Sequence, residues 1–155
     1  MKFDPFEETV RYQKIRKRKK SSQSFLETEY QSLADTLTPA GIHTVEDRIV
    51  RFDEKRRETF KEGGRPGVIT RAPDYHTRWQ TRWVPFSTKT DNRNPDQVVY
   101  LNKETDNVTE DCVALPFFSQ SFHCKTFTQR TGKLQNEKFA AIVSIEQRGI
   151  LYDEF

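Results

Sequence analysis

The N-terminal part of the chain places apolar residues at the spacing of amphipathic helices. A first helix is expected over residues 5–20, because Asp4 can cap it and Pro5 suits its first position. Its apolar face is thin, so we expect it to need a partner. A second helix is expected to begin after Ser24 and to end before Pro39. The apolar stripe of this second helix is Leu26, Tyr30, Leu33 and Leu37.

A third helix is expected from Thr44 to Gly63. Asp47 and Arg51 are spaced four residues apart, as are Asp53 and Arg57, and such pairs stabilise a helix. The apolar side of this segment consists of Val45, Ile49, Phe52 and Phe60. The second and third helices are therefore expected to pack as a hairpin.

The pattern changes after Gly64. Residues 65–79 contain two prolines and no period, which indicates an extended linker. Residues 83–86 and 97–101 are then rich in β-forming types, and the polar stretch 91–96 between them predicts a β-hairpin.

The C-terminal third has no clear period until Lys133. From there to Gly149 the apolar positions fit a helix, which is our prediction, although a strand fits them nearly as well. The apolar positions of this segment are Leu134, Ala141, Ile142 and Ile145.

These elements predict an α+β fold with N-terminal helices, a small three-stranded antiparallel sheet and extended aromatic-rich segments. The expected domains are a helical region at 1–63, a linker at 64–78, a sheet module at 79–117 and a C-terminal extension at 118–155.

Composition argues against one large core. Hydrophobic residues make up 34% of the chain and charged residues 32%, against about 45–50% and about 25% in typical domains. Aromatic side chains, including 12 Phe, supply much of the apolar surface and suit anchoring on a partner. The residues expected to dock on partners are Phe117, Phe118, Phe122 and Phe127.

Basic residues gather near the N-terminus although the net charge is only +3. Cations fill six of the seven positions 14–20, and their mutual repulsion favours contact with the phosphates of RNA or with an acidic surface. A solvated helix face and a nuclear-import signal are two other interpretations of this run. The expected phosphate contacts are Lys14, Arg16, Lys17, Arg18, Lys19 and Lys20.

Residues 79–117 contain Trp83, Tyr100, Asn102, Thr105 and Pro116. The spacing of these five residues resembles that of a degenerate WW domain. The resemblance implies a buckle of Trp83, Tyr100 and Pro116 under a three-stranded sheet. It also implies that Asn102 and Thr105 tie the second turn.

The peptide groove of WW domains is missing, because its two aromatic walls correspond here to Val99 and a position near Glu110. A free peptide-binding adaptor would need that groove. The spacing is instead similar to a variant found in mitochondrial assembly subunits of protists, which implies a docking module inside a structural subunit.

No familiar catalytic motif occurs in the sequence. Residues 63–67, Gly-Gly-Arg-Pro-Gly, lack the spacing and the Lys-Ser/Thr of a phosphate-binding loop. The neighbouring carboxylates Glu110 and Asp111 would point to opposite faces of a strand. The sequence therefore predicts that the chain is not an enzyme and binds no cofactor.

The metal-ligating residue types are scattered. His43, His76 and His123 lie far apart, and Cys112 and Cys124 fit no common zinc spacing. We expect no metal site. The presence of only two cysteines indicates a reducing compartment. No apolar run of about 18 residues occurs, so we expect no membrane span. The acidic start of the chain does not fit a secretory signal.

The leading functional prediction is a non-catalytic structural subunit of a mitochondrial ribosome. Such a protein would lie in the matrix, contact rRNA through its basic helix and pack against other subunits, without a small-molecule substrate. The alternatives are an accessory subunit of a mitochondrial respiratory or ATP-synthase complex, and a cytoplasmic, cytoskeletal protein that lines ciliary microtubules.

Overall fold

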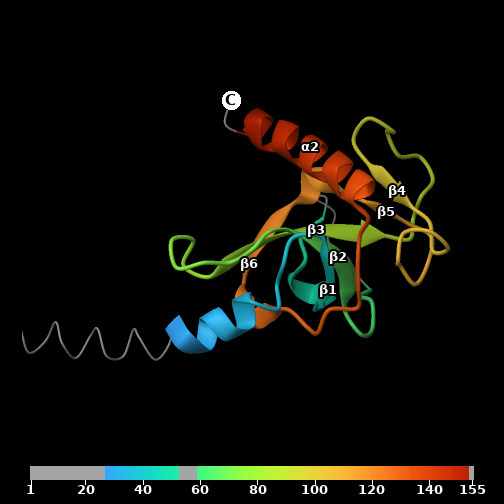
Figure 1. Cartoon of the computed structure of the whole chain (residues 1–155). Helices are drawn as coiled ribbons and strands as arrows, with labels where there is room; N and C mark the ends of the chain where they lie inside the picture. The colour runs from blue at the N-terminus through green and yellow to red at the C-terminus, as the bar shows by residue number, and fades with distance from the viewer. Residues whose placement is uncertain (1–26, 53–58, 154–155) are drawn as a thin grey trace, which may run out of the picture.

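The computed structural model describes residues 27–52 and 59–153. Within these residues the chain forms a curled, seven-stranded antiparallel sheet with helices on both sides (Figure 1). The strands are β1 (Gly41–Val45), β2 (Arg65–Arg71), β3 (Gln80–Ser87), β4 (Val99–Leu101), β5 (Cys112–Ala114), β6 (Gln120–His123) and β7 (Gly132–Lys133). The helical elements are residues 27–34, the short 3-10 helices η1 (Asp47–Ile49), η2 (Pro116–Phe118) and η3 (Cys124–Thr126), and the C-terminal helix α2 (Asn136–Asp153).

Strand β3 organises the sheet. One of its edges pairs with β2, while its other edge is shared between β6 at residues 80–83 and β5 at residues 86–87. The main path runs β4-β5-β3-β2-β1-β7, with β6 off this path. Strand β3 therefore pairs with three other strands.

The sheet separates two apolar cores because successive strand residues face opposite sides. Val68 and Val84 belong to the core that α2 covers with Ile142 and Ile145. Ile69 and Trp83, one residue along on each strand, belong to the core on the other side, which also contains Ala34 and Leu37. Figure 1 shows α2 above the sheet and residues 27–34 below it.

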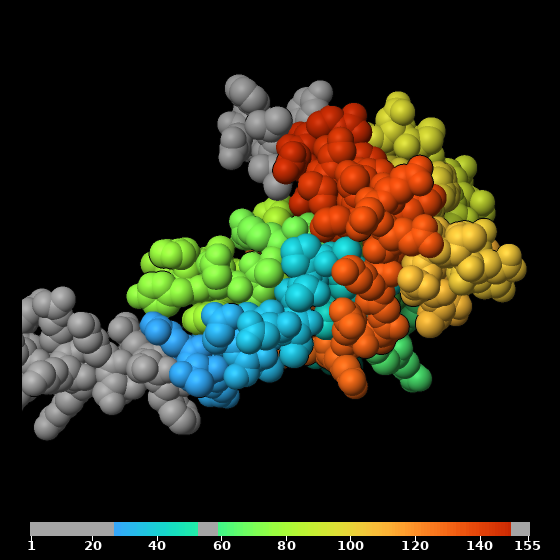
Figure 2. All heavy atoms as spheres, in the orientation of Figure 1, coloured from blue at the N-terminus to red at the C-terminus, as the bar shows by residue number. Residues whose placement is uncertain are grey.

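The loop between β2 and β3 extends over the helix at residues 27–34. Figure 2 shows this loop, in light green, beside the blue atoms of that helix. The rings of Tyr30 and Trp79 meet there, with their centres 5.7 Å apart. The helix is therefore attached to the sheet through aromatic contacts as well as through Ala34 and Leu37.

Gly67 allows β2 to lie directly against the indole of Trp83. A Cβ at position 67 would lie 2.2 Å from Trp83 Cε2, which no side chain could tolerate. The Trp83 ring is fully buried, and its Nε1 donates a hydrogen bond to the carbonyl of His43 at 3.1 Å. This contact fixes β1, β2 and β3 against one another.

The predicted three-stranded sheet is wrong. Strands β3 and β4, expected as a hairpin, are not neighbours, because β5 lies between them and pairs with both. The interpretation as a WW-like module fails for the same reason. Trp83 is buried, whereas Tyr100 is 44% exposed on β4 and Pro116 lies in η2, so they form no common buckle.

The prediction of a third helix that begins at Thr44 is also wrong. Residues expected in the third helix form β1 up to Val45 and the short η1, and β1 pairs with β2 through Ile42–Val68 and Val45–Arg65. Residues 65–71, expected in a linker, form β2. The periodicity of charges favoured a helix locally, but burial of both strand faces decided the structure.

Two helical predictions agree with the structure. Residues 27–34 are helical, within the segment expected between Ser24 and Pro39. Helix α2 covers most of the segment predicted from Lys133 to Gly149 and continues past it. Gly149 is therefore not a cap; a Cβ there would lie 2.7 Å from the ring of Phe117. The helix expected at residues 5–20 lies outside the described residues.

Candidate nucleic-acid interface

The candidate site begins where β2 starts and β3 ends. Gly67 pairs with Pro85, and continuing this register by two residues places Arg65 opposite Ser87. The Arg65 side chain donates from a terminal nitrogen to the carbonyl of Phe86 at 2.9 Å. Arg65 and Ser87, which are far apart in sequence, therefore meet where β2 starts and β3 ends.

Asp47 in η1 holds the guanidinium of Arg65. Asp47 Oδ1 accepts from Arg65 Nε at 2.7 Å, and Oδ2 accepts from a terminal nitrogen at 3.3 Å. The Asp47 side chain is 1% exposed and that of Arg65 16%. A buried carboxylate needs such a partner to offset its lost hydration. The pair therefore fixes the direction of Arg65.

Arg65 keeps donors free for a ligand. A guanidinium has five N–H groups, and those three hydrogen bonds use three of them within the described part of the chain. Its flat face also lies over the ring of Phe52, 4.5 Å from the ring centre. The two remaining N–H groups suit the bidentate binding of a phosphate.

A groove surrounds this arginine. It consists of two adjoining hollows that share Arg65, Thr88 and Lys89. The first hollow is also lined by Phe52, Ser87, Arg93 and Phe118. The second is also lined by Asp47, Thr59, Phe60, Lys61 and Glu110. We call this surface the cationic groove.

The turn after β3 supplies hydroxyl and cationic groups to the cationic groove. Ser87 Oγ accepts from the backbone N–H of Lys89 at 3.2 Å and from a terminal nitrogen of Arg93 at 3.4 Å. Arg93 Nε donates to the Lys89 carbonyl at 3.1 Å. These bonds hold the turn and leave the hydroxyl hydrogen of Ser87 available to a ligand.

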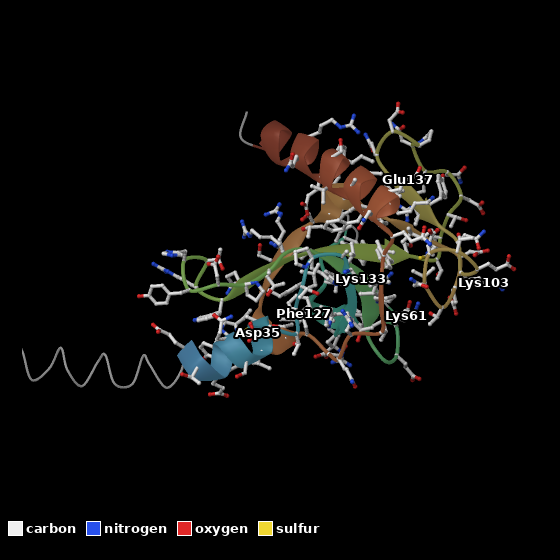
Figure 3. The ribbon with its side chains drawn as sticks, viewed as in Figure 1. Asp35, Lys61, Lys103, Phe127, Lys133 and Glu137 are labelled. Atoms are coloured by element: carbon white, nitrogen blue, oxygen red, sulfur yellow. The ribbon has the colours of Figure 1, made fainter. Side chains whose placement is uncertain are left out.

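Lys61 and Glu110 also line the cationic groove. The backbone N–H of Lys61 donates to Asp47 Oδ2 at 2.7 Å, which ties this loop to η1. Lys61 and Lys103 lie at the same end of the molecule in Figure 3. The neighbouring Asp111 is engaged elsewhere, because its Oδ1 accepts from Lys103 N at 2.9 Å. Glu110 is exposed and lines the cationic groove.

The composition of the cationic groove suits single-stranded nucleic acid. Among the described residues that line it, four are cationic, and the charge of Asp47 is balanced by Arg65. Phosphates bind such cations, while bases stack on aromatic rings such as Phe60 and Phe118. The same surface therefore offers contacts to both parts of a nucleotide.

Among the described residues, no histidine or cysteine lines the cationic groove. Burial is the largest cause that lowers the pKa of His43, whose Nδ1 lies 2.7 Å from the carbonyl of Thr128. Burial raises the pKa of Cys112 to about 11, so its thiol stays neutral. Burial likewise raises the pKa of Cys124 and lowers that of His123. In residues 27–52 and 59–153 no group of three such side chains or carboxylates is placed to hold a metal ion.

The structure disperses the residues that the sequence singled out. Lys14, Arg16, Lys17, Arg18, Lys19 and Lys20 lie outside the described residues, so their phosphate contacts stay a prediction. Asn102 holds its turn through Oδ1, which accepts from Glu104 N at 2.8 Å, and the backbone N–H of Thr105 donates to the Asn102 carbonyl at 3.2 Å.

The four phenylalanines expected to dock on partners differ in exposure. Phe117 is 41% exposed, whereas Phe118 is partly buried beside Phe52. Phe122 and Phe127 are partly buried against Trp83, with ring centres 5.8 and 6.4 Å from its ring. Their role in docking stays a prediction.

Sequence reasoning missed Arg65, Asp47 and Ser87. The available signal was Arg65-Pro66-Gly67 before an apolar strand, a pattern that predicted a linker and does not match a phosphate loop. Neither Asp47 nor Ser87 could be placed beside Arg65 without the pairing of β2 with β3 and the position of η1. The described residues contain no helix with the length and apolar character needed to cross a membrane.

No model of a known protein family matches the sequence, and no curated protein matches it. Solved structures, however, share its fold. An endoribonuclease from a mycobacterial species is 11% identical over 74% of this chain and 91% of its own, with a TM-score of 0.51. A mycobacterial endoribonuclease in complex with its cognate antitoxin is 12% identical over 73% of this chain and 94% of its own, also at 0.51. The toxin MazF-mt6 of Mycobacterium tuberculosis is 13% identical over 71% of this chain and 95% of its own, at 0.49.

These comparisons correct the functional predictions. Two of the solved structures that share the curled sheet are endoribonucleases, so the prediction of a non-catalytic subunit of a mitochondrial ribosome is wrong, as are its alternatives in other large assemblies. The expectation that the chain is not an enzyme is wrong for the same reason. The mitochondrial location is untouched by these findings and stays a prediction. At this level of identity, the comparisons show the fold of the chain.

Proposed function

We propose that the chain is an endoribonuclease that cleaves single-stranded RNA in the cationic groove. The observation that carries the proposal is Arg65, held by the buried Asp47 with two N–H groups left for a phosphate. The endoribonuclease fold of similar solved structures supports the same activity.

The chemistry of this site is an attack of the ribose 2′ oxygen on the adjacent phosphorus. The bond from phosphorus to the 5′ oxygen breaks, which leaves a 2′,3′-cyclic phosphate and a free 5′ hydroxyl. Glu110 is the carboxylate placed to take the 2′-hydroxyl proton, and a lysine ammonium of the groove or water returns a proton to the departing 5′ oxygen.

Arg65 stabilises the charge that grows on the phosphate oxygens during this attack. Its guanidinium does not have to reorganise, because Asp47 and the Phe86 carbonyl already hold it. The hydroxyls of Ser87 and Thr88 can donate to the same oxygens. The site therefore combines fixed positive charge with neutral donors.

Unpaired RNA is the substrate that fits this surface. Two aromatic residues on the groove, Phe60 and Phe118, can stack only on bases that are free of a double helix. A duplex would keep its bases away from these rings.

We further infer a protein partner that neutralises the activity by covering the cationic groove. One similar endoribonuclease is found in complex with its cognate antitoxin. An acidic segment would match the charges of Lys61, Arg65, Lys89 and Arg93, and binding there would exclude RNA.

A cleavage assay tests the activity. The purified chain should convert an end-labelled, unstructured RNA into fragments with 2′,3′-cyclic phosphate ends, and Arg65→Ala should lower the rate about 10²-fold or more. Arg71→Ala is the matched control, because Arg71 is exposed at the opposite end of the same strand. Equal rates for the two variants, or no cleavage by the wild-type chain, would refute the proposal.

A further inference from the structure

Gln120 is a buried polar residue on β6 that the proposed reaction does not use. It is 4% exposed, and it pairs with Trp83 in the register between β6 and β3. A buried amide needs hydrogen-bond partners to offset its lost hydration. Those partners are backbone groups of the two segments that carry Phe52 and Phe118.

The Gln120 amide uses its oxygen and both of its N–H groups. Nε2 donates to the carbonyl of Arg51 at 2.7 Å and to the carbonyl of Phe118 at 2.9 Å, while Oε1 accepts from the backbone N–H of Arg51 at 2.7 Å. Residues 50–52 lie in neither a helix nor a strand, so no regular element pairs the backbone of Arg51. The amide takes the place of a neighbouring strand and fixes the chain directly before Phe52.

Phe52 lies against the cation of the proposed site. The guanidinium carbon of Arg65 lies over the Phe52 ring, 4.5 Å from its centre. The ring of Phe118 packs beside that of Phe52, with the two ring centres 5.9 Å apart. Gln120 therefore holds the backbone next to both rings, one of which carries the guanidinium on its face.

The Phe52 ring and the hydrogen bonds of Arg65 restrict different motions. Asp47 and the carbonyl of Phe86 accept at the edges of the guanidinium, which fixes its direction within its own plane. The Phe52 ring lies on one face, where the attraction between a cation and an aromatic ring opposes a tilt of that plane. A phosphate that accepts from two N–H groups needs both the direction and the tilt to be correct.

We propose that Gln120 is a positioning residue for Arg65, which it holds through Phe52. The inference rests on the proposed endoribonuclease function and extends it to the residues that orient its cation. Gln120 fixes the backbone of Arg51, and the Phe52 ring then fixes the plane of the guanidinium. The rate of the reaction therefore depends on a glutamine that does not line the cationic groove.

Steady-state kinetics on a short, unstructured RNA tests this role. Gln120→Met keeps the length of the side chain and removes its hydrogen bonds. It should lower kcat about tenfold and change KM by less than about twofold, because a misplaced group harms the reaction more than substrate capture. Gln135→Met is the matched control, since Gln135 Nε2 donates to the backbone carbonyl of Thr105 at 3.0 Å, outside the groove lining. This control should keep the wild-type kcat.

Changes at Phe52 distinguish positioning from a general loss of stability. Phe52→Leu removes the flat ring and should lower kcat to a similar extent, whereas Phe52→Tyr, which keeps the ring, should lose less. The double variant with Gln120→Met and Phe52→Leu should lose no more than Phe52→Leu alone, because the two residues act in series. Two losses that multiply, or a wild-type kcat for Gln120→Met, would refute the positioning role.

The side-chain NMR signal of the Arg65 Nε–H group, assigned by its absence in Arg65→Lys, separates this proposal from the activity. Gln120→Met should shift the signal, because the ring current of Phe52 acts differently on a tilted guanidinium, and Gln135→Met should not. If the wild type cleaves RNA but Gln120→Met leaves the signal in place, the positioning role is refuted and the activity stands. If the signal shifts but the wild type cleaves no RNA, the activity is refuted and the hold on Arg65 stands. With neither a shift nor cleavage, both are refuted.

Discussion

Asp47 and Arg65 form an ion pair whose two members differ in exposure. Their closest atoms, Oδ1 and Nε, are 2.7 Å apart, with the carboxylate side chain 1% exposed and the arginine side chain 16%. The buried member therefore acts as the anchor, while the arginine keeps one edge toward the cationic groove. Moving Arg65 would remove the cation that offsets the buried charge of Asp47.

Asp47→Asn should show whether Asp47 positions Arg65 for the reaction or contributes to the binding of RNA. Loss of the anchoring charge should lower the free energy of unfolding by on the order of 3 kcal/mol, because it leaves the arginine without its buried partner. RNA cleavage should lose about 10²-fold in kcat with a smaller change in KM, since a misplaced group harms the reaction more than substrate capture. Urea denaturation and steady-state kinetics measure the two effects.

The exposed Asp35 provides the control, as Asp35→Asn should leave both quantities near the wild-type values. A variant of Asp47 with normal kcat but lowered stability would limit this residue to a structural role. Arg65→Lys should not restore activity, because an ammonium cannot reproduce the planar fork that meets both Asp47 and a phosphate.

Gly67→Ala should disrupt the sheet. The added Cβ would lie 2.2 Å from Trp83 Cε2 and 2.4 Å from the Val84 carbonyl oxygen, and neither buried neighbour has space to move. We expect the free energy of unfolding to fall by about 3 kcal/mol, at the upper end of the usual effect of overpacking. Thermal unfolding followed by near-ultraviolet dichroism measures it.

Gly149→Ala is the contrasting change. Its Cβ would meet the ring of Phe117, which is 41% exposed and can turn away, and alanine favours the helix by about 1 kcal/mol over glycine. This variant should stay within about 1 kcal/mol of the wild type. Equal destabilisation at the two positions would show that the contact of Gly67 with Trp83 is not special.

His43 should make the fold sensitive to mild acid. Burial lowers its pKa in the folded chain below the ordinary value of about 6.5, and its Nε2 has no partner among the described residues. As the pH falls below about 6.5, the unfolded chain takes up the proton first, so stability is lost toward the lower folded pKa. Above that pH the contribution is complete.

The urea midpoint should therefore fall between about pH 7.5 and about pH 5.5, and His43→Gln should reduce this dependence. His76→Gln, at an exposed position, should retain it. If the pH dependence of His43→Gln matched that of the wild type, the histidine would not be the group that responds.

The basic run at residues 14–20 should add to RNA affinity. Affinity should fall with salt, and changing Arg16, Lys17, Arg18 and Lys19 to Ala should reduce the slope of log affinity against log salt. The expected reduction is roughly 0.7–0.9 for each phosphate that the run neutralises. Fluorescence anisotropy with a labelled RNA measures the slope. An unchanged slope would mean that this run does not touch phosphates.

The sequence by itself determined the features that depend on near neighbours. The stripe through Tyr30 and Leu37 predicted the helix that is observed at residues 27–34, and the apolar positions from Leu134 to Ile145 predicted α2. Both follow from side chains three or four residues apart, which face one another on a helix whatever the rest of the chain does.

The tertiary structure decided the sheet and the site. The order of β3, β5 and β4 depends on which strands bury each other's faces, so neighbouring sequence segments could not reveal it. Trp83 and Tyr100 both belong to the spacing that resembles a WW domain. The strand order nevertheless leaves Trp83 buried and Tyr100 exposed. Asp47, Arg65 and Ser87 meet only because β2 pairs with β3 in one register and η1 lies beside them. That register is fixed by burial on both faces of the sheet, a property of the whole fold that no local pattern contains.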